Sequence, residues 1–270
     1  MVQETFELLR LRTKTLEALG YKVNDRTLSD LRKRFSEDYR KLQLAHSNED
    51  VVYTGAEYPG NLKLPNITIL PLLRTIQGNV VAGQTMGHQH TQYLENDSRT
   101  FQEIYEFQGY GAMLLRNNSG TRLHVLRPGE KVTAGKDDDM TVINLGLYPL
   151  VTLDYANPQM NKAHMKLEEE IGPMFLVQFT EKGMTFKINS DYVAKKILSD
   201  SFEVTIPSAN AEECVQNLLH ARKSFEAAGI QVIEGTNLPD YLRKEFAYPL
   251  RELVLRRNKT LLGLLGFNSD

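Results

Sequence analysis

The stretch that decides the fold is GAMLLRNNSGTRLHVL at residues 111–126. It contains two short runs of β-forming residues, Gly111–Asn117 and Thr121–Leu126, separated by a turn that ends at Gly120. Because Asn, Ser and Gly favour a tight connection, we expect the two runs to pair as an antiparallel hairpin. A second turn, Arg127-Pro128-Gly129-Glu130, follows directly and predicts that the chain turns back again.

The same pattern of short β-rich runs extends over residues 51–155. The expected strands are Ile67–Leu73, Gly78–Thr85, Thr100–Phe107, Gly111–Asn117, Thr121–Leu126, Lys131–Ala134, Met140–Leu145 and Leu150–Tyr155. Short strands separated by turn residues at this spacing are typical of a small barrel or jelly roll.

The regions on either side follow other patterns. Between residues 4 and 44 apolar side chains recur every three or four positions, which predicts two amphipathic helices with a break near 20–25. After about residue 166, strand-like runs are mixed with a helix at 209–228 and a long leucine-rich helix after Pro239. The predicted organisation is a helical arm at 1–48, a β barrel at 49–165 and an α+β lobe at 166–270.

Composition excludes several classes of protein. The chain has 270 residues, of which 41% are hydrophobic and 24% charged, so it can form an ordinary globular core. A net charge of −2 gives no electrostatic basis for binding nucleic acid or an anionic membrane. The single cysteine, Cys214, cannot form an intrachain disulfide. With no long apolar run and a charged N-terminal stretch, we expect a cytoplasmic protein.

His88-Gln89-His90 carries the strongest chemical signal in the chain. Residues two apart on an extended strand face the same side, so this pair can direct two imidazoles at one ion. The next predicted strand carries Glu103, a carboxylate donor. Two imidazoles and one carboxylate leave coordination positions open for substrate or water. The alternatives are a chance pair of histidines and a solvent-exposed Glu103.

Several ordered motifs surround these residues. They are TMGHQH at 85–90, EIYEFQGYGAMLL at 103–115, RPG at 127–129, VINLG at 142–146, TILP at 68–71 and RTLSDL at 26–31. Together they resemble the cupin-type phosphoglucose isomerases over roughly residues 26–160. The resemblance implies a mainly β cupin jelly-roll barrel that interconverts glucose 6-phosphate and fructose 6-phosphate, a reaction of glycolysis and gluconeogenesis.

The resemblance also implies roles for individual residues. His88, His90 and Glu103 would hold one divalent transition metal ion, with Fe, Mn, Ni, Co and Zn as the candidates. Glu103 would also be the catalytic base that moves the proton between C1 and C2, and both an enediol and a hydride-shift mechanism stay open. The positions implied to bind the substrate and its phosphate are Tyr53, Thr68, Thr85, Gly87 and Tyr105.

Two positions depart from the family's pattern. The fourth metal ligand falls on Met140, and a thioether is a soft donor that suits such ions poorly. Either a carboxylate of Asp137–Asp139 replaces it, or Met140 is a core residue beside a site of two histidines and one carboxylate. The family's phosphate-proximal histidine has no counterpart, and the nearest ionisable residues are Lys162 and His164.

Two further readings remain beside the isomerase. One is a sugar-phosphate sensor whose metal site has decayed at Met140, and the other is a cupin enzyme that acts on a different small polar substrate. His46, His124 and His220 show no partner pattern and are expected to be structural or solvent-facing. Sheet edges and the leucine-rich last helix predict a homodimer.

Overall fold

The computed structural model describes most of the central part of the chain. The described residues are 11–30, 47–58, 65–71, 73–74, 80–81, 83–85, 88–91, 101–135, 138–146, 148–156, 161–163, 173–195, 201–238 and 263. For residues 73–74, 80–81, 88–91, 101–103, 156 and 161–163 the description concerns the backbone alone. Gly87, the second half of the expected helical arm and the leucine-rich helix after Pro239 lie outside the described residues.

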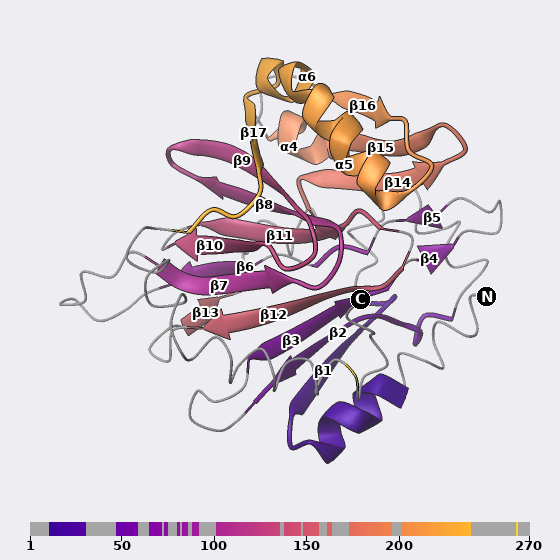
Figure 1. The fold of residues 1–270 in the computed structure, drawn as a ribbon, viewed down its shortest axis with the longest axis vertical. Coiled ribbons are helices and arrows are strands. Elements are labelled where there is room, and N and C mark those ends of the chain that lie inside the picture. The colour runs from indigo at the N-terminus through magenta and orange to yellow at the C-terminus, as the bar shows by residue number, and fades with distance from the viewer. Residues whose placement is uncertain are drawn as a thin grey trace.

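The strands pair in the order of a jelly roll (Figure 1). β8 (Gly111–Asn117) and β9 (Gly120–Leu126) form the hairpin predicted from the sequence, at the tip of a long antiparallel ribbon. Along this ribbon follow the pairs β7 (Phe101–Phe107) with β10 (Lys131–Gly135), β6 (His88–Thr91) with β11 (Asp139–Asn144), and β3 (Asn66–Leu70) with β12 (Leu150–Ala156). Because successive pairs alternate between two sheets, the ribbon wraps around a common interior. The predicted mainly β jelly-roll fold is confirmed.

Two six-stranded sheets enclose this interior. The first sheet has the order β1-β2-β3-β12-β7-β10, where β1 is Lys22–Thr27 and β2 is Val51–Glu57. The second sheet has the order β13-β6-β11-β8-β9-β17, where β13 is Asn161–Ala163 and β17 is Ile230–Glu234. Alternate side chains from both sheets fill the space between them. This interior cluster consists of Leu70, Tyr105, Phe107, Met113, Leu115, Leu126, Val132, Ala134, Met140, Val142 and Leu150.

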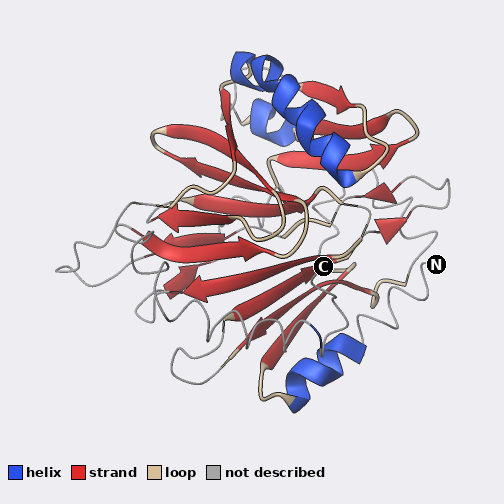
Figure 2. Cartoon of the chain, in the orientation of Figure 1, coloured by secondary structure: helices blue, strands red, loops and turns tan. Residues whose placement is uncertain are grey.

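The outer faces of both sheets are covered as well. The helix at residues 11–18 packs Leu16 against the outer face of the first sheet, beside Ile67 and Leu153. The C-terminal lobe covers the outer face of the second sheet, at the top of Figure 2. Each sheet is therefore buried on both faces, and this explains why apolar residues are frequent at successive strand positions.

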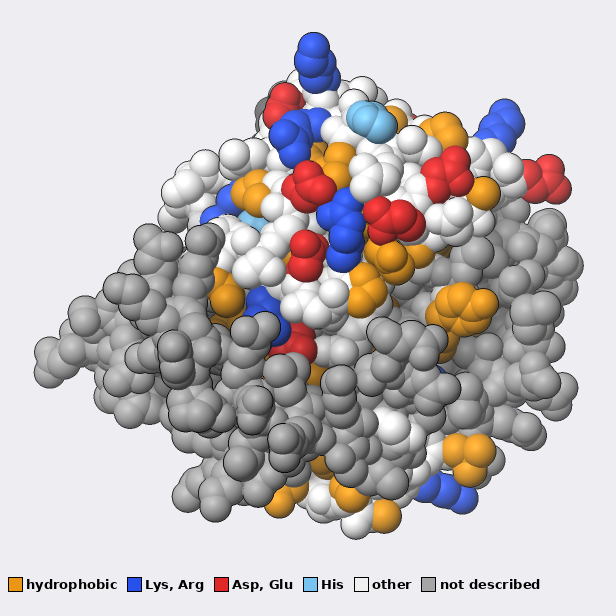
Figure 3. Space-filling model, in the orientation of Figure 1, with side chains coloured by type: hydrophobic (Ala, Val, Ile, Leu, Met, Phe, Trp, Pro, Cys, Tyr) orange, Lys and Arg blue, Asp and Glu red, His pale blue; other side chains and the backbone are white. Residues whose placement is uncertain are grey.

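The C-terminal lobe contains a third sheet with the order β16-β15-β14-β5-β4. Its own strands are β14 (Phe175–Thr180), β15 (Gly183–Ile188) and β16 (Glu203–Ile206). The other two, β4 (Leu73–Arg74) and β5 (Val80–Val81), come from the segment between β3 and β6. Three helices accompany the sheet: α4 (Ser190–Ala194), α5 (Ala211–His220) and α6 (Arg222–Ala227). Basic and acidic side chains are interspersed over the helical face of this lobe (Figure 3).

Three elements differ from the sequence-based expectation. Residues 22–27, where only a break between two helices was expected near 20–25, form β1, an edge strand paired with β2. The helix expected at 209–228 consists of α5 and α6, with Ala221 between them. β17 leaves the C-terminal lobe and pairs in parallel with β9, so residues from both sides of the predicted boundary at 165 share one sheet.

Candidate functional site

The backbone register places the predicted metal ligands on the walls of the jelly-roll interior. His88 on β6 lies opposite Met140 on β11, and Glu103 on β7 lies opposite Ala134 on β10. Met140 and Ala134 both belong to the interior cluster. Directly paired residues of neighbouring strands share a face of the sheet, so positions 88 and 103 lie on the interior faces of the second and first sheets. Position 90 shares the face of position 88.

Met140, which was expected to correspond to the fourth ligand position, is packed as a core residue. Its side chain is 1% exposed, and it lies opposite Leu115 as well as His88. Met140 is therefore a buried core residue of the jelly-roll interior.

The alternative carboxylates near Met140 are committed to other contacts. Asp138 is buried and accepts hydrogen bonds from Arg122 Nη2 at 2.8 Å, Asn117 Nδ2 at 2.7 Å and the Gly135 N–H at 2.8 Å. Asp139 lies on the opposite face of β11 and accepts a hydrogen bond from Arg116 Nε at 3.0 Å. Their role as replacement ligands is therefore not supported, and Asp137 lies outside the described residues.

A buried polar network lies on the interior face of the first sheet. Asp154 on β12 is 4% exposed and accepts hydrogen bonds from Thr68 Oγ1 at 3.0 Å and from Thr152 Oγ1 at 2.7 Å. Asp154 lies opposite Tyr105, two positions along β7 from Glu103. Because both threonine hydroxyls donate their protons to the carboxylate, their oxygens can still accept hydrogen bonds. The network therefore suits a ligand that donates hydrogen bonds, such as a sugar hydroxyl.

The other predicted binding residues lie in different environments. Tyr105 is buried in the interior cluster, and Tyr53 packs against the same cluster from β2. Thr85 is half-buried, and its Oγ1 accepts a hydrogen bond from the Val142 N–H at 3.0 Å. Lys162 on β13 lies opposite His90 in the backbone register, whereas His164 lies outside the described residues.

Sequence reasoning missed Asp154 and Thr152. The signal was the alternation in β12, where polar Thr152 and Asp154 alternate with apolar Val151 and Leu153. Alternation normally directs the polar set outward. Here the apolar set packs beneath the N-terminal helix and the polar set faces the interior. The sequence therefore showed the alternation, but it did not show which set of side chains faces inward.

His124 on β9 is a second buried polar residue that the sequence did not single out. It lies opposite Met113 of the interior cluster, it is fully buried, and among the described residues neither ring nitrogen has a hydrogen-bond partner. Burial, and then the charge of Arg122, lower the pKa of His124 to about 4. The imidazole is therefore neutral at physiological pH.

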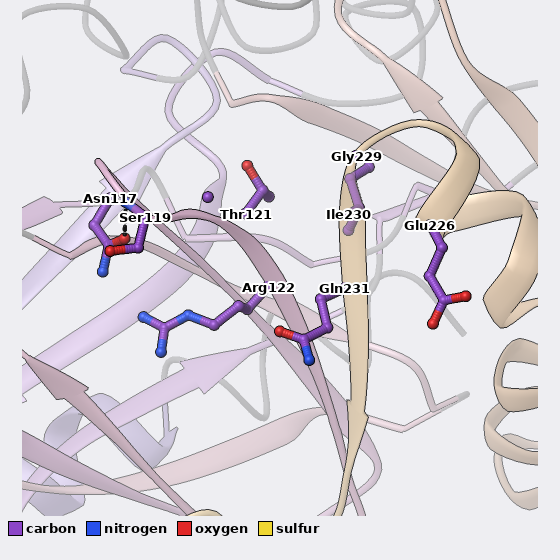
Figure 4. Close-up of a pocket in the computed structure, with 9 residues that line it drawn as sticks. Asn117, Ser119, Thr121, Arg122, Glu226, Gly229, Ile230 and Gln231 are labelled. Atoms are coloured by element: carbon purple, nitrogen blue, oxygen red, sulfur yellow. Dashed lines mark hydrogen bonds between the residues drawn. The ribbon is translucent and has the colours of Figure 1, made fainter.

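A surface pocket of about 450 Å³ lies between the β8–β9 turn and the start of β17 (Figure 4). It is lined by Asn117, Ser119, Gly120, Thr121, Arg122, Glu226, Gly229, Ile230 and Gln231. Arg122 and Gln231 are paired in the register and extend in the same direction from adjacent strands. The lining contains none of the predicted site residues, so this pocket is separate from the positions of His88, His90 and Glu103.

The rest of the described chain offers no competing metal centre. Within the residues whose side chains the structure describes, no group of three or more His, Cys, Asp or Glu residues is placed to hold a metal ion. Cys214 on α5 forms no disulfide and is buried in the core of the lobe, where its Sγ contacts Met184 Sδ at 3.7 Å. None of the described helices combines the length and the apolar character that crossing a membrane requires.

Comparisons with known proteins find weak similarity to solved structures. No protein-family model matches the chain, and no curated protein matches it. Among solved structures, the chain is similar to the CENP-C cupin domain of Drosophila melanogaster, with 10% identity, coverage of 42% of this chain and 71% of that chain, and a TM-score of 0.27. It spans 65% of another structure of that domain.

Two further solved structures extend this comparison. A cupin-superfamily sugar phosphate isomerase from Silicibacter pomeroyi is 14% identical, covers 52% of this chain and 78% of that chain, and has a TM-score of 0.26. Vicilin from Corylus avellana is 6% identical, covers 42% and 35%, and has a TM-score of 0.26. With TM-scores this low, the fold assignment rests on the strand pairing, and no activity is taken from these proteins.

Proposed function

We propose that this protein is a metal-dependent aldose–ketose isomerase that interconverts glucose 6-phosphate and fructose 6-phosphate. The observation that carries the proposal is the register of β6 and β7. It gives His88 and Glu103 interior neighbours, Met140 and Ala134, that belong to one buried cluster. This register supports the proposal, because three donors of the kind that bind transition metals would then face the same interior.

The donor set suits one divalent transition metal ion. His88 and His90 would supply imidazole nitrogens and Glu103 a carboxylate oxygen, which leaves coordination positions for the substrate. When bound, the ion would polarise the sugar carbonyl as a Lewis acid. Packing of the Met140 side chain beside this position keeps that corner of the interior apolar and limits the access of water.

The chain's own residues would then perform the proton transfer and hold the sugar. Glu103 as a carboxylate would take the proton from C2 of the aldose and return it to C1 of the ketose. The oxygens of Thr68, Thr152 and Asp154 would accept hydrogen bonds from sugar hydroxyls, since the threonine protons already point to Asp154. Tyr105 is buried, lies two positions along β7 from Glu103 and is paired with Asp154 of the network. Its side chain would form the surface against which the sugar lies.

A non-catalytic sugar-phosphate sensor is the second candidate function. Met140 favours it, because a packed thioether replaces the ligand that the family has at this point of β11. The sensor would bind the same ligand through the polar network of Asp154 without holding a metal ion. Metal content therefore separates the two candidates.

The test is a coupled assay of fructose 6-phosphate conversion to glucose 6-phosphate. Protein stripped with a chelator is reloaded separately with Mn, Fe, Ni, Co or Zn, and the Glu103→Gln variant is assayed in parallel. We expect metal-dependent turnover that falls by at least about 10²-fold in Glu103→Gln. An absence of turnover with every ion, together with an absence of stoichiometric metal, would reject the isomerase and leave the sensor.

A further inference from the structure

The segment that leads into the His-x-His strand is held by the C-terminal lobe. β5 pairs with β14 through Val81 opposite Gln178 and Val80 opposite Phe179. This pairing makes β5 a strand of the lobe's own sheet, seven residues of chain before β6 begins at His88. The lobe thus contacts the chain immediately before the predicted metal ligands.

Gln84 makes a second connection to the lobe. Its side chain is 3% exposed, and Nε2 donates a hydrogen bond to the backbone oxygen of Phe175 at 3.0 Å. The backbone of Gln84 forms a bridge with Ile143 on β11, whose side chain belongs to the core shared with the lobe. Gln84 therefore lies between the second sheet of the jelly roll and the first strand of the lobe.

The residues on either side of Gln84 fix its position along β11. The Asn144 N–H donates to the Gly83 oxygen at 2.9 Å, and the Thr85 N–H donates to the Val142 oxygen at 3.0 Å. Gly83 also passes close to the preceding corner of the chain, where an added Cβ would lie 2.2 Å from the Pro71 oxygen. No other residue type fits this path without movement of the backbone.

We infer that Gln84 is a positioning residue, through which the C-terminal lobe sets the direction in which β6 enters the second sheet. The inference rests on the proposed function, because its purpose is to hold His88 and His90 in a metal-binding arrangement. Metal ligands lose affinity when the structure that orients them is loosened, by roughly 10- to 100-fold for direct hydrogen-bond partners. Gln84 is not a direct hydrogen-bond partner of a ligand, so we expect its loss to weaken metal affinity by about tenfold, the lower end of this range.

This inference gives the lobe a role that neither its sequence nor its apolar core indicates. Most of the lobe's contact with the jelly roll is made by apolar side chains on the outer face of the second sheet. Gln84 is an exception, because its buried amide makes a hydrogen bond from the jelly roll to the lobe. A hydrogen bond fixes the relative orientation of its partners, whereas apolar contacts do not. Loss of the amide would leave the apolar contacts in place while the entry to β6 is loosened.

The experiment compares Gln84→Leu with Asn189→Leu in the full chain. Asn189 is the control, because it is equally buried at 3% and its Nδ2 donates to a backbone oxygen of the same lobe, that of Pro173, at 3.3 Å. Its Oδ1 also accepts a hydrogen bond from the Asp191 N–H at the start of α4, so this variant is the more disruptive one for the lobe. Titration calorimetry gives the Mn²⁺ dissociation constant, the visible absorption of bound Co²⁺ reports the ligand geometry, and thermal unfolding reports stability.

We expect Gln84→Leu to weaken Mn²⁺ binding about tenfold and to change the Co²⁺ spectrum. Asn189→Leu should keep the wild-type affinity and spectrum at an equal or larger loss of thermal stability. Equal affinity in Gln84→Leu and wild type, or equal weakening in both variants, would overturn the positioning role. If the wild-type protein itself binds no metal ion, the proposed function fails first, and this result is distinguishable from the other two.

Discussion

The two cores on either side of the second sheet are built differently. The cluster shared with the C-terminal lobe is apolar and includes a group of neighbouring phenylalanines. The ring centroid of Phe225 lies 5.6 Å from that of Phe186, in an edge contact, and 5.1 Å from that of Phe202, in a tilted one. The jelly-roll interior also has apolar walls, but it includes buried polar groups such as Asp154 and His124.

This difference indicates that the two cores have different roles, one in stability and the other in ligand binding. Burial of a polar group costs free energy unless it is hydrogen-bonded, so a core that serves stability alone is expected to be apolar. The cluster on the lobe side of the second sheet meets that expectation, and the amides of Gln84 and Asn189 buried beside it each donate a hydrogen bond. The interior side retains a carboxylate and an imidazole on the faces to which the register assigns His88 and Glu103. We therefore interpret the lobe side as the stabilising core and the interior as the functional one.

The largest effect is expected from truncation of the stabilising core. Phe225→Ala should lower the free energy of unfolding by about 3–5 kcal/mol, because it removes a fully buried ring and leaves a cavity among its aromatic neighbours. Urea denaturation followed by circular dichroism measures the change. Phe225→Leu is the control and should cost less than half as much. A loss below about 1 kcal/mol for Phe225→Ala would contradict the central place of this ring.

The next effect concerns His124 and depends on pH. Burial and the charge of Arg122 lower the pKa of this imidazole from 6.5 to about 4. Between these two values the unfolded chain binds a proton that the folded chain does not. The contribution of His124 to stability is therefore fully present above pH 6.5 and is lost as the pH falls toward 4. The loss amounts to about 3 kcal/mol.

Substitution of His124 tests this dependence. Urea denaturation of His124→Leu at pH 7 and at pH 4.5 should show a smaller difference in the free energy of unfolding than wild type shows. The exposed His220 is the control, and His220→Gln should leave the wild-type difference unchanged. A wild-type pH dependence that persists in full in His124→Leu would show that other groups cause it.

The smallest effect on stability is expected at Asp154. Asp154→Asn keeps the size of the side chain but removes the charge that accepts hydrogen bonds from Thr68 and Thr152, so the free energy of unfolding should fall by about 1–2 kcal/mol. Binding of a sugar phosphate, measured by calorimetry, should weaken by more than this loss of stability explains. Thr152→Val, which removes one of the two donors, is the control with the weaker effect. Unchanged binding in Asp154→Asn would assign the network a structural role only.

The fold was predictable where local signals agree with the tertiary structure. Asn117-Asn118-Ser119-Gly120 indicated the β8–β9 hairpin, and Gly120 adopts a φ of 132° in that turn. Gly229, with a φ of 77°, ends the helical region as its position in the sequence indicated. Such positions depend on backbone preferences that a glycine satisfies regardless of its distant neighbours.

Other features were not predictable because they depend on distant partners. β1 has the polar sequence KVNDRT and is a strand through its pairing with β2, supported by Thr54 Oγ1 donating to Asp25 Oδ1 at 2.6 Å. Asp154 faces the interior because the apolar face of β12 packs against the N-terminal helix on the outside of the sheet. His88, His90 and Glu103 were identified from residue types and a resemblance, and the structure adds their register to this identification.

The central claim is that the interior between β6 and β7 holds one metal ion, and the most direct measurement is anomalous X-ray diffraction from crystals of the Mn²⁺-loaded protein. We predict one strong anomalous peak within coordination distance of a ring nitrogen of His88, a ring nitrogen of His90 and a carboxylate oxygen of Glu103. A peak at other residues, or the absence of a peak in protein that diffracts well, would contradict it.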